Sequence, residues 1–581
     1  MKCRASCCWV LKQSFDTNHS LCYTPRESHT AGKFRTFNGS ASFCASWGGD
    51  EFWRPEKPAS IPLLPRRRGR WGEMQQAGKW IEGLSRGRLA LLMMGLFALI
   101  NLAYATSGLR MEQYPLICYM QVLDTSLLQH RLLESVFYLH MQPPLFNFFL
   151  GVGLHLFPKH ALLAFQICYW IMGLGLYYAV FAVARRLAVS RPLALVLSTV
   201  FLASPSYIVY EHWLFYTFPL ALLVTLSGLL FARVLKQPRF WVCSAFFWVV
   251  LALCLTRSVF LLIYLVLVTL LLLLLRPANR RAILLAACLP ILLLTGLYVK
   301  NYVLFRQFSV STWLGMNLSG MTVQAVPIQL RQQLVAEGKL SQLALISRFS
   351  KLEDYPAEYL EMHGFEGIPV LRKLHRDAGG VNYNSLVYLR LSDEYLRDDL
   401  YVIRHFPQYY LVGMLNAWLC YFRPGSDYWV IQSSFDKVKT VCTVYDYLCY
   451  GKVPYYVIRL GKLPIYYAAY TRPYLYLFLL FGLPMLVIYG WRLARRSTHL
   501  DPEQRVLLGY LCANIVFVAL VVNSFEVGEN HRMRFMTDPL YVVLLGVVLQ
   551  HSLLPCLRKY WPTSKQSALP EAITENTSVR S

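Results

Sequence analysis

Long apolar segments, separated by short polar links, run through most of the chain. An apolar helix of about 20 residues crosses the hydrocarbon core of a bilayer. Spans are predicted near residues 89–106, 161–184, 193–209, 213–232, 240–256, 259–275, 282–299, 473–491, 506–522 and 539–555. Two shorter apolar stretches, 143–157 and 409–421, are expected to be re-entrant or interfacial. The pattern predicts an all-α polytopic membrane helix bundle with about 10–12 spans.

Basic residues gather in alternate links between these segments. They precede the first predicted span and follow the second, fourth, sixth and eighth: Arg66, Arg67, Arg68, Arg70, Arg86, Arg88, Arg185, Arg186, Arg191, Lys236, Arg239, Arg276, Arg280, Arg281, Arg492, Arg495 and Arg496. The positive-inside rule makes all of these links cytoplasmic if 143–157 does not cross. The first link, residues 107–142, is then non-cytoplasmic, and so are the polar region, residues 303–408, and the late turn, residues 522–540.

Composition agrees with this topology. Of the 581 residues, 56% are hydrophobic and 15% are charged, whereas soluble domains are nearer a quarter charged. The net charge of +25 is read as a topology signal, so the expected partner is a lipid bilayer and not a nucleic acid. The 15 cysteines form no C-x-x-C pair, which argues against a zinc site of the usual spacing. Cys442 and Cys449 lie in the predicted external region, where a disulfide is chemically permitted. The sequence leaves two alternatives, a disulfide between them or two free thiols.

Five regions follow from these patterns. Residues 1–85 are predicted to be a disordered basic tail, or to reflect a mis-called start with translation beginning at Met74. The others are an N-terminal membrane bundle with the first link (86–302), an external or interfacial region (303–471), C-terminal spans (472–557) and a cytoplasmic tail (558–581). Within the polar region, a helix is expected over 392–405, capped by Ser392 and stopped by Pro407.

The first link carries the acids that suit catalysis. Asp124 is the first candidate for a base that takes a proton from an incoming hydroxyl, and Glu134 is the second. The alternative for each is a solvated loop acid. His140 and Gln142 precede a Pro-Pro turn and are candidates for hydrogen bonding a polar ligand, with a structural role as the alternative.

Further polar residues mark the ends of predicted spans on the same side. Candidates for sugar or acceptor binding are Glu211, His212, Asn301, Trp313 and Asn317, since Trp offers an apolar ring face and Asn a paired donor and acceptor. Arg257 and Lys300 are candidates for a phosphate at headgroup depth, because cations make charge-assisted hydrogen bonds to its oxygens. Each alone also fits a helix-end residue that snorkels to the interface.

The late turn is the densest polar group in the chain. It contains Glu526, Glu529, Asn530, His531, Arg532, Arg534 and Asp538 between two apolar segments. Arg532 and Arg534 are candidates for holding a phosphate leaving group, where fixed cations stabilise developing negative charge. Glu529 and Asn530 are assigned to sugar or acceptor binding. The alternative is a salt-bridged structural turn.

Three of these features together resemble the GT-C superfamily of integral-membrane glycosyltransferases, in the branch of protein O-mannosyltransferases and aminoarabinose transferases. They are an acid in the first external loop (Asp124), a Pro-Pro-Leu entry to the next apolar helix (143–145), and a late E-N-x-R-x-R-F turn (529–535). Many members have adjacent Asp-Glu in that loop, whereas here Thr125 follows Asp124, which keeps Glu134 as an alternative base.

The resemblance implies a polyprenyl- or dolichyl-phosphate-linked sugar donor, used at the non-cytoplasmic face with inversion at the anomeric carbon. The acceptor is then a hydroxyl of a glycan, a lipid or a protein, and neither a cofactor nor a catalytic metal is expected. The membrane is the plasma or inner membrane in a bacterium and the endoplasmic reticulum in a eukaryote. Two other classes stay open, a lipid or polysaccharide transporter and a non-catalytic membrane scaffold.

Overall fold

The structure is a computed structural model that describes residues 68–426, 431, 434, 437–441, 444, 455–460, 463–468 and 473–556. The chain forms two compact units, Met1–Trp80 and Ile81–Ser581. Helix α2, Arg68–Gly83, occupies the end of the region predicted as a disordered tail. The rest of that tail, Cys442, Cys449 and the predicted cytoplasmic tail lie outside the described residues.

The second unit is built mainly from helices. The helices of its first part are α3 Arg86–Ala105, α4 Tyr114–Cys118, α5 Thr125–His130, α6 Leu132–Phe137, α7 Leu145–Leu156, α8 Ala161–Arg186, α9 Arg191–Leu202, α10 Pro205–Glu211, α11 Thr217–Lys236, α12 Phe240–Thr256, α13 Leu262–Leu275, η2 Pro277–Asn279 and α14 Arg280–Phe305. The polar region and its continuation contain α15 Leu314–Ser319, η3 Val323–Ala325, α16 Ile328–Ala336, η4 Gln342–Leu345, η5 Leu352–Asp354, α17 Ala357–Leu360, α18 Pro369–Arg372, α19 Leu386–His405 and α20 Pro407–Tyr421. The last described helices are α22 Pro473–Arg496, α23 Pro502–Phe525, α24 Asn530–Arg534, α25 Asp538–Val548 and η7 Leu549–Leu553.

Two short strands depart from the predicted all-α chain. Strands β1, Tyr455–Leu460, and β2, Leu463–Ala468, pair antiparallel, from Tyr455 opposite Ala468 to Leu460 opposite Leu463. Their sequences are rich in Tyr, Val and Ile, which favour strands over helices. The prediction of a purely helical chain therefore missed one small hairpin.

Six helices in the described residues are long and apolar enough to cross a membrane. They are α3, α8, α11, Pro277–Phe305, α23 and Asp538–Cys556. A bent pair, α9 with α10, adds a seventh if it counts as one span, and α7, α12 and α13 are shorter apolar helices. The protein is therefore a helical, multi-pass membrane protein, and several of the predicted spans are shorter or more broken than expected.

The segment predicted as one continuous span over 193–209 is wrong, because it breaks between α9 and α10 at an angle of 60°. Ser204 stands at the break with extended backbone (φ −67°, ψ 140°), and its hydroxyl accepts a hydrogen bond from the N–H of Tyr207 at 3.4 Å. Proline disfavours helical backbone in the residue before it, so Pro205 ends the incoming helix and starts the next one.

Helix α7 occupies most of the apolar stretch 143–157 that was expected to be re-entrant or interfacial. It has 12 residues, and its N-cap is Pro144. At 1.5 Å per residue it is about 18 Å long, which is well short of the roughly 30 Å hydrocarbon core.

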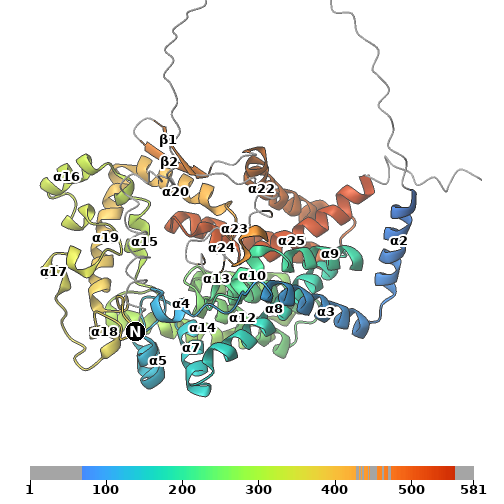
Figure 1. Ribbon diagram of the computed structural model, residues 1–581, viewed down its shortest axis with the longest axis horizontal. Coiled ribbons are helices and arrows are strands. Elements are labelled where there is room, and N and C mark those ends of the chain that lie inside the picture. The colour runs from blue at the N-terminus through green and yellow to red at the C-terminus, as the bar shows by residue number, and fades with distance from the viewer. Residues whose placement is uncertain are drawn as a thin grey trace, which may run out of the picture. The chain divides into compact units, whose positions relative to one another are not determined.

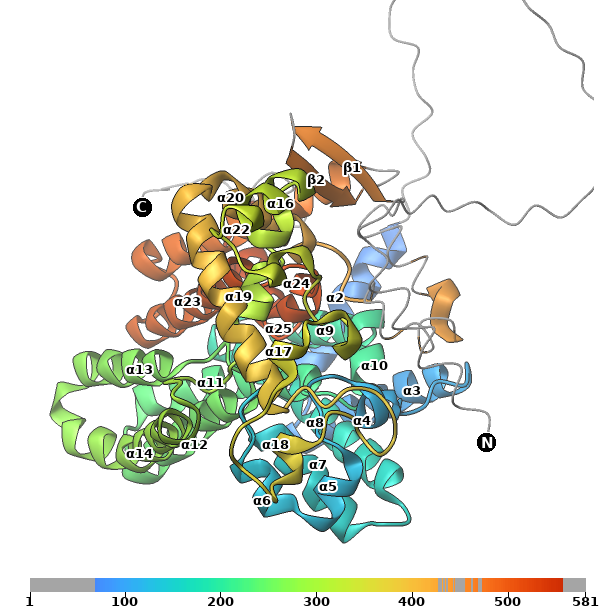
Figure 2. The same ribbon diagram turned by 90° about the vertical axis from the view of Figure 1, so that its left-hand side faces the viewer.

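The first link, the polar region and the late turn lie together at one end of the membrane helices. Helices α15 to α19 gather at the left of Figure 1, and Figure 2 looks onto them from that end. The N–H of Thr312 donates to the carbonyl of His140 at 3.1 Å, and the N–H of His140 donates to Asn384 Oδ1 at 2.9 Å. Arg348 Nη2 donates to the carbonyl of Val527 at 3.0 Å. Segments far apart in sequence are thus joined at this end.

Helix α19 begins earlier than predicted. It starts at Leu386 after Ser385, so Ser392 lies within the helix and does not cap it. Its end agrees with the prediction, since Pro407 begins the next helix. Helix α15 crosses α19 closely, because a Cβ added at Gly315 would lie 2.0 Å from the carbonyl oxygen of Ser392 and 2.5 Å from the backbone nitrogen of Leu396. The sequence pattern began the helix at the charged residues and missed the apolar turns before them.

We expect Gly315→Ala to destabilise the protein, because the added methyl group meets backbone atoms of α19 that cannot rotate away. Overpacking of this kind costs about 1–3 kcal/mol. The measurement is the thermal unfolding midpoint in detergent, compared with Gly296→Ala in α14, where an added Cβ has nothing within 4 Å. Equal midpoints for the two variants would contradict the close crossing.

Candidate functional site

Two buried arginines from distant parts of the chain meet around the ring of Tyr216. Arg257 directly follows α12, and Arg532 lies in α24. The Cζ atoms of Arg257 and Arg532 lie 5.2 Å and 5.6 Å from the centroid of this ring. Arg257 also donates a hydrogen bond to the Tyr216 hydroxyl. We call the group formed by Tyr119, Gln142, Tyr216, Arg257, Arg348, Glu526, Glu529 and Arg532 the buried charge cluster.

Arg532 is fully buried, with 0% of its surface exposed. Its Nη1 donates to Thr217 Oγ1 at 3.0 Å, and its Nη2 pairs with Glu529. The Cζ atom also lies 5.2 Å from the Phe215 ring centroid and 5.9 Å from that of Trp213. Aromatic faces attract a guanidinium group, so the surrounding rings help to offset the cost of burying its charge.

Arg257 connects the first link to the late turn. Its Nη1 donates to Gln142 Oε1 at 3.2 Å, and its Nη2 donates to Glu526 Oε2 at 3.3 Å. Only 3% of the residue is exposed, and its Nε has no hydrogen-bond partner among the described residues. A buried donor without a partner is costly, which makes Arg257 a candidate for binding a ligand.

Glu526 and Glu529 supply the negative charge of the cluster. Glu529 Oε1 accepts from the Tyr119 hydroxyl at 2.9 Å, while its Oε2 accepts from Arg532. Burial raises the pKa of Glu526, and the nearby charge of Glu529 raises it further, whereas Arg257 and Arg532 oppose the shift. Two acids that share a site compete for ionisation, so Glu526 holds a proton to higher pH than a free glutamate.

A third guanidinium group, Arg348, lies beside these acids. It donates to the carbonyl oxygens of Asn317 at 2.8 Å and Val527 at 3.0 Å. Burial lowers the pKa of Arg348, and the charges of Glu526 and Glu529 counteract that effect. Asp399 is also near, but burial raises the pKa of its carboxyl well above the usual value. The cluster therefore contains three arginines, Arg257, Arg348 and Arg532, and two glutamates, Glu526 and Glu529, so it has a formal surplus of positive charge.

Asn530 and Arg534, the other predicted site residues of the late turn, stabilise the conformation of the turn. Asn530 Nδ2 donates to Asn523 Oδ1 at 3.0 Å and to the carbonyl of Glu526 at 2.8 Å. Arg534 pairs with Asp538 at 2.9 Å and donates to the carbonyls of Tyr421 and Arg423. These contacts fit the alternative of a salt-bridged structural turn for Asn530 and Arg534, while Glu529 and Arg532 belong to the cluster.

Asp124 caps a helix. Its Oδ1 accepts from the N–H of Ser126 at 3.3 Å at the start of α5, and its Oδ2 accepts from the N–H of Asp377 at 2.8 Å. Glu134 pairs with Arg131 at 3.2 Å on a surface where 33% of the Glu134 side chain is exposed. Asp124 thus joins the first link to the polar region, and Glu134 lies in a partly solvated ion pair.

His140 is enclosed between the first link and the polar region. Its Nδ1 lies 2.8 Å from Thr312 Oγ1, and its Nε2 lies 2.9 Å from the carbonyl oxygen of Asn384. Burial lowers the pKa of His140 to about 3, while the hydrogen bond to Asn384 opposes the shift and the charge of Lys300 adds to it. The imidazole is therefore neutral at physiological pH, and its contacts are structural.

Lys300 and Asn301 also make contacts with the backbone. Lys300 Nζ donates to the carbonyls of Phe137 at 2.7 Å and Leu139 at 3.1 Å. Asn301 Nδ2 donates to the carbonyl of Ser309 at 2.6 Å. Lys300 thus connects α14 to the first link, and Asn301 connects it to the loop that follows α14. These contacts differ from the roles in phosphate and sugar binding that the sequence suggested for the two residues.

The adjacent side chains of Glu211 and His212 make different contacts. The carboxylate of Glu211 is fully buried and packs over Gly173 of α8, where an added Cβ would lie 1.8 Å from Glu211 Oε1. His212 Nδ1 lies 2.9 Å from the carbonyl of Ile208, and its own carbonyl accepts from the N–H of Glu112 at 2.7 Å. Glu211 is thus directed between helices, where a soluble acceptor has no direct access.

Trp313 is buried among aromatic rings, so its ring faces are not open to a sugar. The Trp313 centroid lies 5.2 Å from that of Phe349 and 5.8 Å from that of Tyr383. Asn317 contributes its backbone carbonyl to Arg348. The described residues contain no group of three or more His, Cys, Asp or Glu side chains that could hold a metal ion.

Sequence reasoning overlooked several members of the cluster. Tyr119, Tyr216 and Arg348 were not singled out, because each stands alone in an apolar or mixed segment without a local motif. Glu526 was noted within the late turn but was given no role. The density of charge in that turn was the available signal, and it pointed to the correct segment.

The comparisons with known proteins add no family to this description. A scan against protein-family models finds no match to the chain. A search of curated proteins finds no match either. Function is therefore inferred from the residues of this chain.

We expect acid to destabilise the protein through His140. The unfolded chain binds a proton at about pH 6.5, whereas the folded chain does so only at about pH 3. Between these values the unfolded state holds more protons, so stability falls as the pH is lowered. At pH 5 this loss amounts to about 2 kcal/mol, since one pKa unit corresponds to about 1.4 kcal/mol.

The measurement is the unfolding midpoint at pH 7 and pH 5 for the wild type and His140→Gln, which preserves hydrogen-bonding capacity without titrating. The drop should be smaller in the variant. His363→Gln is the matched control, because 86% of the His363 side chain is exposed. If His140→Gln loses as much stability in acid as the wild type, another group is responsible.

Proposed function

We propose that this protein is a glycosyltransferase that uses a sugar donor linked to polyprenyl or dolichyl phosphate at the non-cytoplasmic face of the membrane. The observation that carries the proposal is the surplus positive charge of the buried charge cluster, located where apolar helices end. Burying an ion costs several kcal/mol unless a partner compensates it. An anionic ligand supplies the missing partner.

The kind of ligand follows from the shape and depth of the cluster. Guanidinium groups present donors in a planar fork that matches phosphate oxygens. Arg257 directly follows the apolar helix α12, and Glu526 directly follows the candidate span α23. Positions at the ends of these apolar helices suit a lipid phosphate whose hydrocarbon chain remains in the bilayer.

Phosphate binding at this point also suits catalysis. When the bond between the sugar and the phosphate breaks, negative charge develops on the leaving phosphate. Fixed cations such as Arg257 and Arg532 stabilise that charge more in the transition state than in the bound donor, which lowers the barrier. Among the donor-binding candidates, these two have the contacts that support this role best.

A base must also accept the proton of the acceptor hydroxyl. Asp124 and Glu134 stay candidates on the first link, but both oxygens of Asp124 accept from backbone N–H groups. Glu526 is the better candidate, because its raised pKa brings it closer to physiological pH, where a general base works best. The acceptor is a hydroxyl compound whose class the cluster does not specify.

The test measures binding of undecaprenyl phosphate and dolichyl phosphate to the purified protein by native mass spectrometry. Arg257→Gln and Arg532→Gln should weaken binding by at least about tenfold, because truncating a desolvated charged contact costs about 2–5 kcal/mol. Arg131→Gln is the control, since its ion pair is exposed. Unfolding midpoints of all variants separate lost binding from lost fold, and unchanged binding in both arginine variants would remove the phosphate role.

Transfer is tested in the same preparation with Glu526→Gln. This variant should retain the lipid phosphate but lower sugar transfer from a lipid-phosphate donor about 10²–10⁴-fold, the usual contribution of a general base. Asp124→Asn should mainly lower stability. Binding without transfer in the wild type, together with movement of the lipid between leaflets, would favour a transporter.

The predicted orientation of the membrane helices has a separate test. Cysteines introduced singly at Glu353 in the polar region and at Arg496, the last residue of α22, should react differently with an impermeant thiol reagent in sealed cells. We expect Glu353→Cys to label directly and Arg496→Cys only after permeabilisation, because basic links remain in the cytoplasm. The background is a variant without reactive native cysteines, and the reverse pattern would invert the topology.

A further inference from the structure

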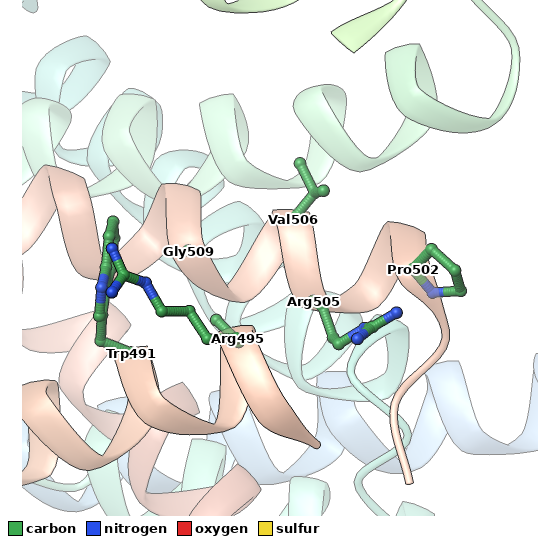
Figure 3. Close-up of a pocket in the computed structure, with 7 residues that line it drawn as sticks. Trp491, Arg495, Pro502, Arg505, Val506 and Gly509 are labelled. Carbon is green, nitrogen blue, oxygen red and sulfur yellow. The ribbon is translucent and has the colours of Figure 1, made fainter. Parts of the chain in front are cut away.

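A cavity of about 320 Å³ lies between the end of α22 and the start of α23. Trp491 and Arg495 line it from α22, and Pro502, Arg505 and Gly509 line it from α23. Figure 3 shows the side chain of Arg495 beside the ring of Trp491, with Arg505 farther along the cavity. Most of the remaining wall is apolar, so the cavity combines two cations with a surface suited to hydrocarbon.

Both cations are available to a ligand. The Cζ atom of Arg495 lies 5.4 Å from the centroid of the Trp491 ring, which orients the guanidinium group without neutralising it. Arg505 Nε is buried and has no hydrogen-bond partner among the described residues. The lining residues include no acid.

The nearest acids in sequence are already occupied. Glu503 pairs with Arg276 at 2.8 Å. Asp501 caps α23, since its Oδ1 accepts from the N–H of Gln504 at 2.8 Å. The positive charge of the cavity is therefore not cancelled by these two carboxylates, and an anion complements it.

The location of the cavity identifies the source of that anion. It lies at the N-terminal end of α23, whose 24 residues extend about 36 Å before the chain enters the buried charge cluster. The cavity is thus at the other end of a membrane helix from the candidate site, at the level of the opposite headgroups. Trp491 is 41% exposed there, as is typical of aromatic residues at the membrane interface.

We infer that this cavity binds the phosphate headgroup of an anionic phospholipid from the leaflet opposite the candidate site. Arg495 and Arg505 hold the phosphate oxygens, and the apolar wall near Gly509 accepts the upper part of the acyl chains. Basic pockets between membrane helices on the cytoplasmic side recognise lipid headgroups by this chemistry. The lipid is bound and not consumed, so this site is independent of the proposed sugar transfer.

The test uses the delipidated full-length protein in detergent with phosphatidylglycerol, phosphatidylcholine or inorganic phosphate added. Native mass spectrometry and the unfolding midpoint both report binding. Phosphatidylglycerol should bind and raise the midpoint of the wild type, whereas the double variant Arg495→Gln/Arg505→Gln should bind it at least about tenfold more weakly. Arg492→Gln is the matched control, because Arg492 is exposed on the same helix but does not line the cavity.

A second variant tests the cavity without changing charge. Gly509→Val places a side chain where an added Cβ has Ala494 at 3.9 Å as its nearest neighbour, so it should fill the cavity and weaken lipid binding while the protein still folds. Equal weakening by Arg492→Gln would assign the effect to general surface charge. Equal binding of phosphatidylcholine, or a response to inorganic phosphate alone, would overturn the proposed lipid headgroup site.

Discussion

The buried pair of Arg532 and Glu529 is the interaction on which the candidate site depends. It is formed between the N-cap residue of α24 and a residue of its first turn, yet its outer contacts reach Tyr119 in the first link and Thr217 at the start of α11. An isolated guanidinium group at 0% exposure is unstable in a medium of low polarity, so these contacts must form together. The need to satisfy one buried cation thus fixes three distant segments at the same end of the membrane helices.

Charged residues near this pair fall into two groups: some belong to the buried charge cluster, and others stabilise the backbone. Arg257 and Glu526 extend the charge cluster toward Gln142, and Arg348 approaches it from the polar region. Other cationic residues nearby donate hydrogen bonds to the backbone instead. Arg534 and Lys300 donate to carbonyl oxygens, although in sequence they look as suited to phosphate as Arg257 does.

The sequence was a good guide to helical, membrane-embedded character, because apolar run length depends on the local residues alone. It also located the late turn, because this turn has more charged residues than a short link between two apolar helices requires. It did not predict the break at Ser204 and Pro205 within an otherwise apolar run, nor the early start of α19. Helix ends of this kind depend on backbone geometry and on neighbours such as Gly315, which a periodic pattern does not contain.

Site membership was harder to predict for a physical reason. Whether a cation holds a ligand or a loop depends on which acceptors face it, and those acceptors come from far along the chain. Trp313 illustrates the point, because its aromatic neighbours Phe349 and Tyr383 are 36 and 70 positions away and enclose the ring that would otherwise meet a sugar. Local sequence therefore identified the right types of residue without identifying which of them share the cluster.

The ion pair between Arg257 and Glu526 has a consequence for biosynthesis. The two residues are 269 positions apart, so Arg257 leaves the ribosome long before its acid exists. At about 5–20 residues per second, the interval is roughly 13–54 s. During that time the end of α12 cannot reach its final burial without an unpaired charge, and it must stay hydrated or associated with other proteins. A chain interrupted before α23 would retain this defect permanently, which marks it for recognition by quality control.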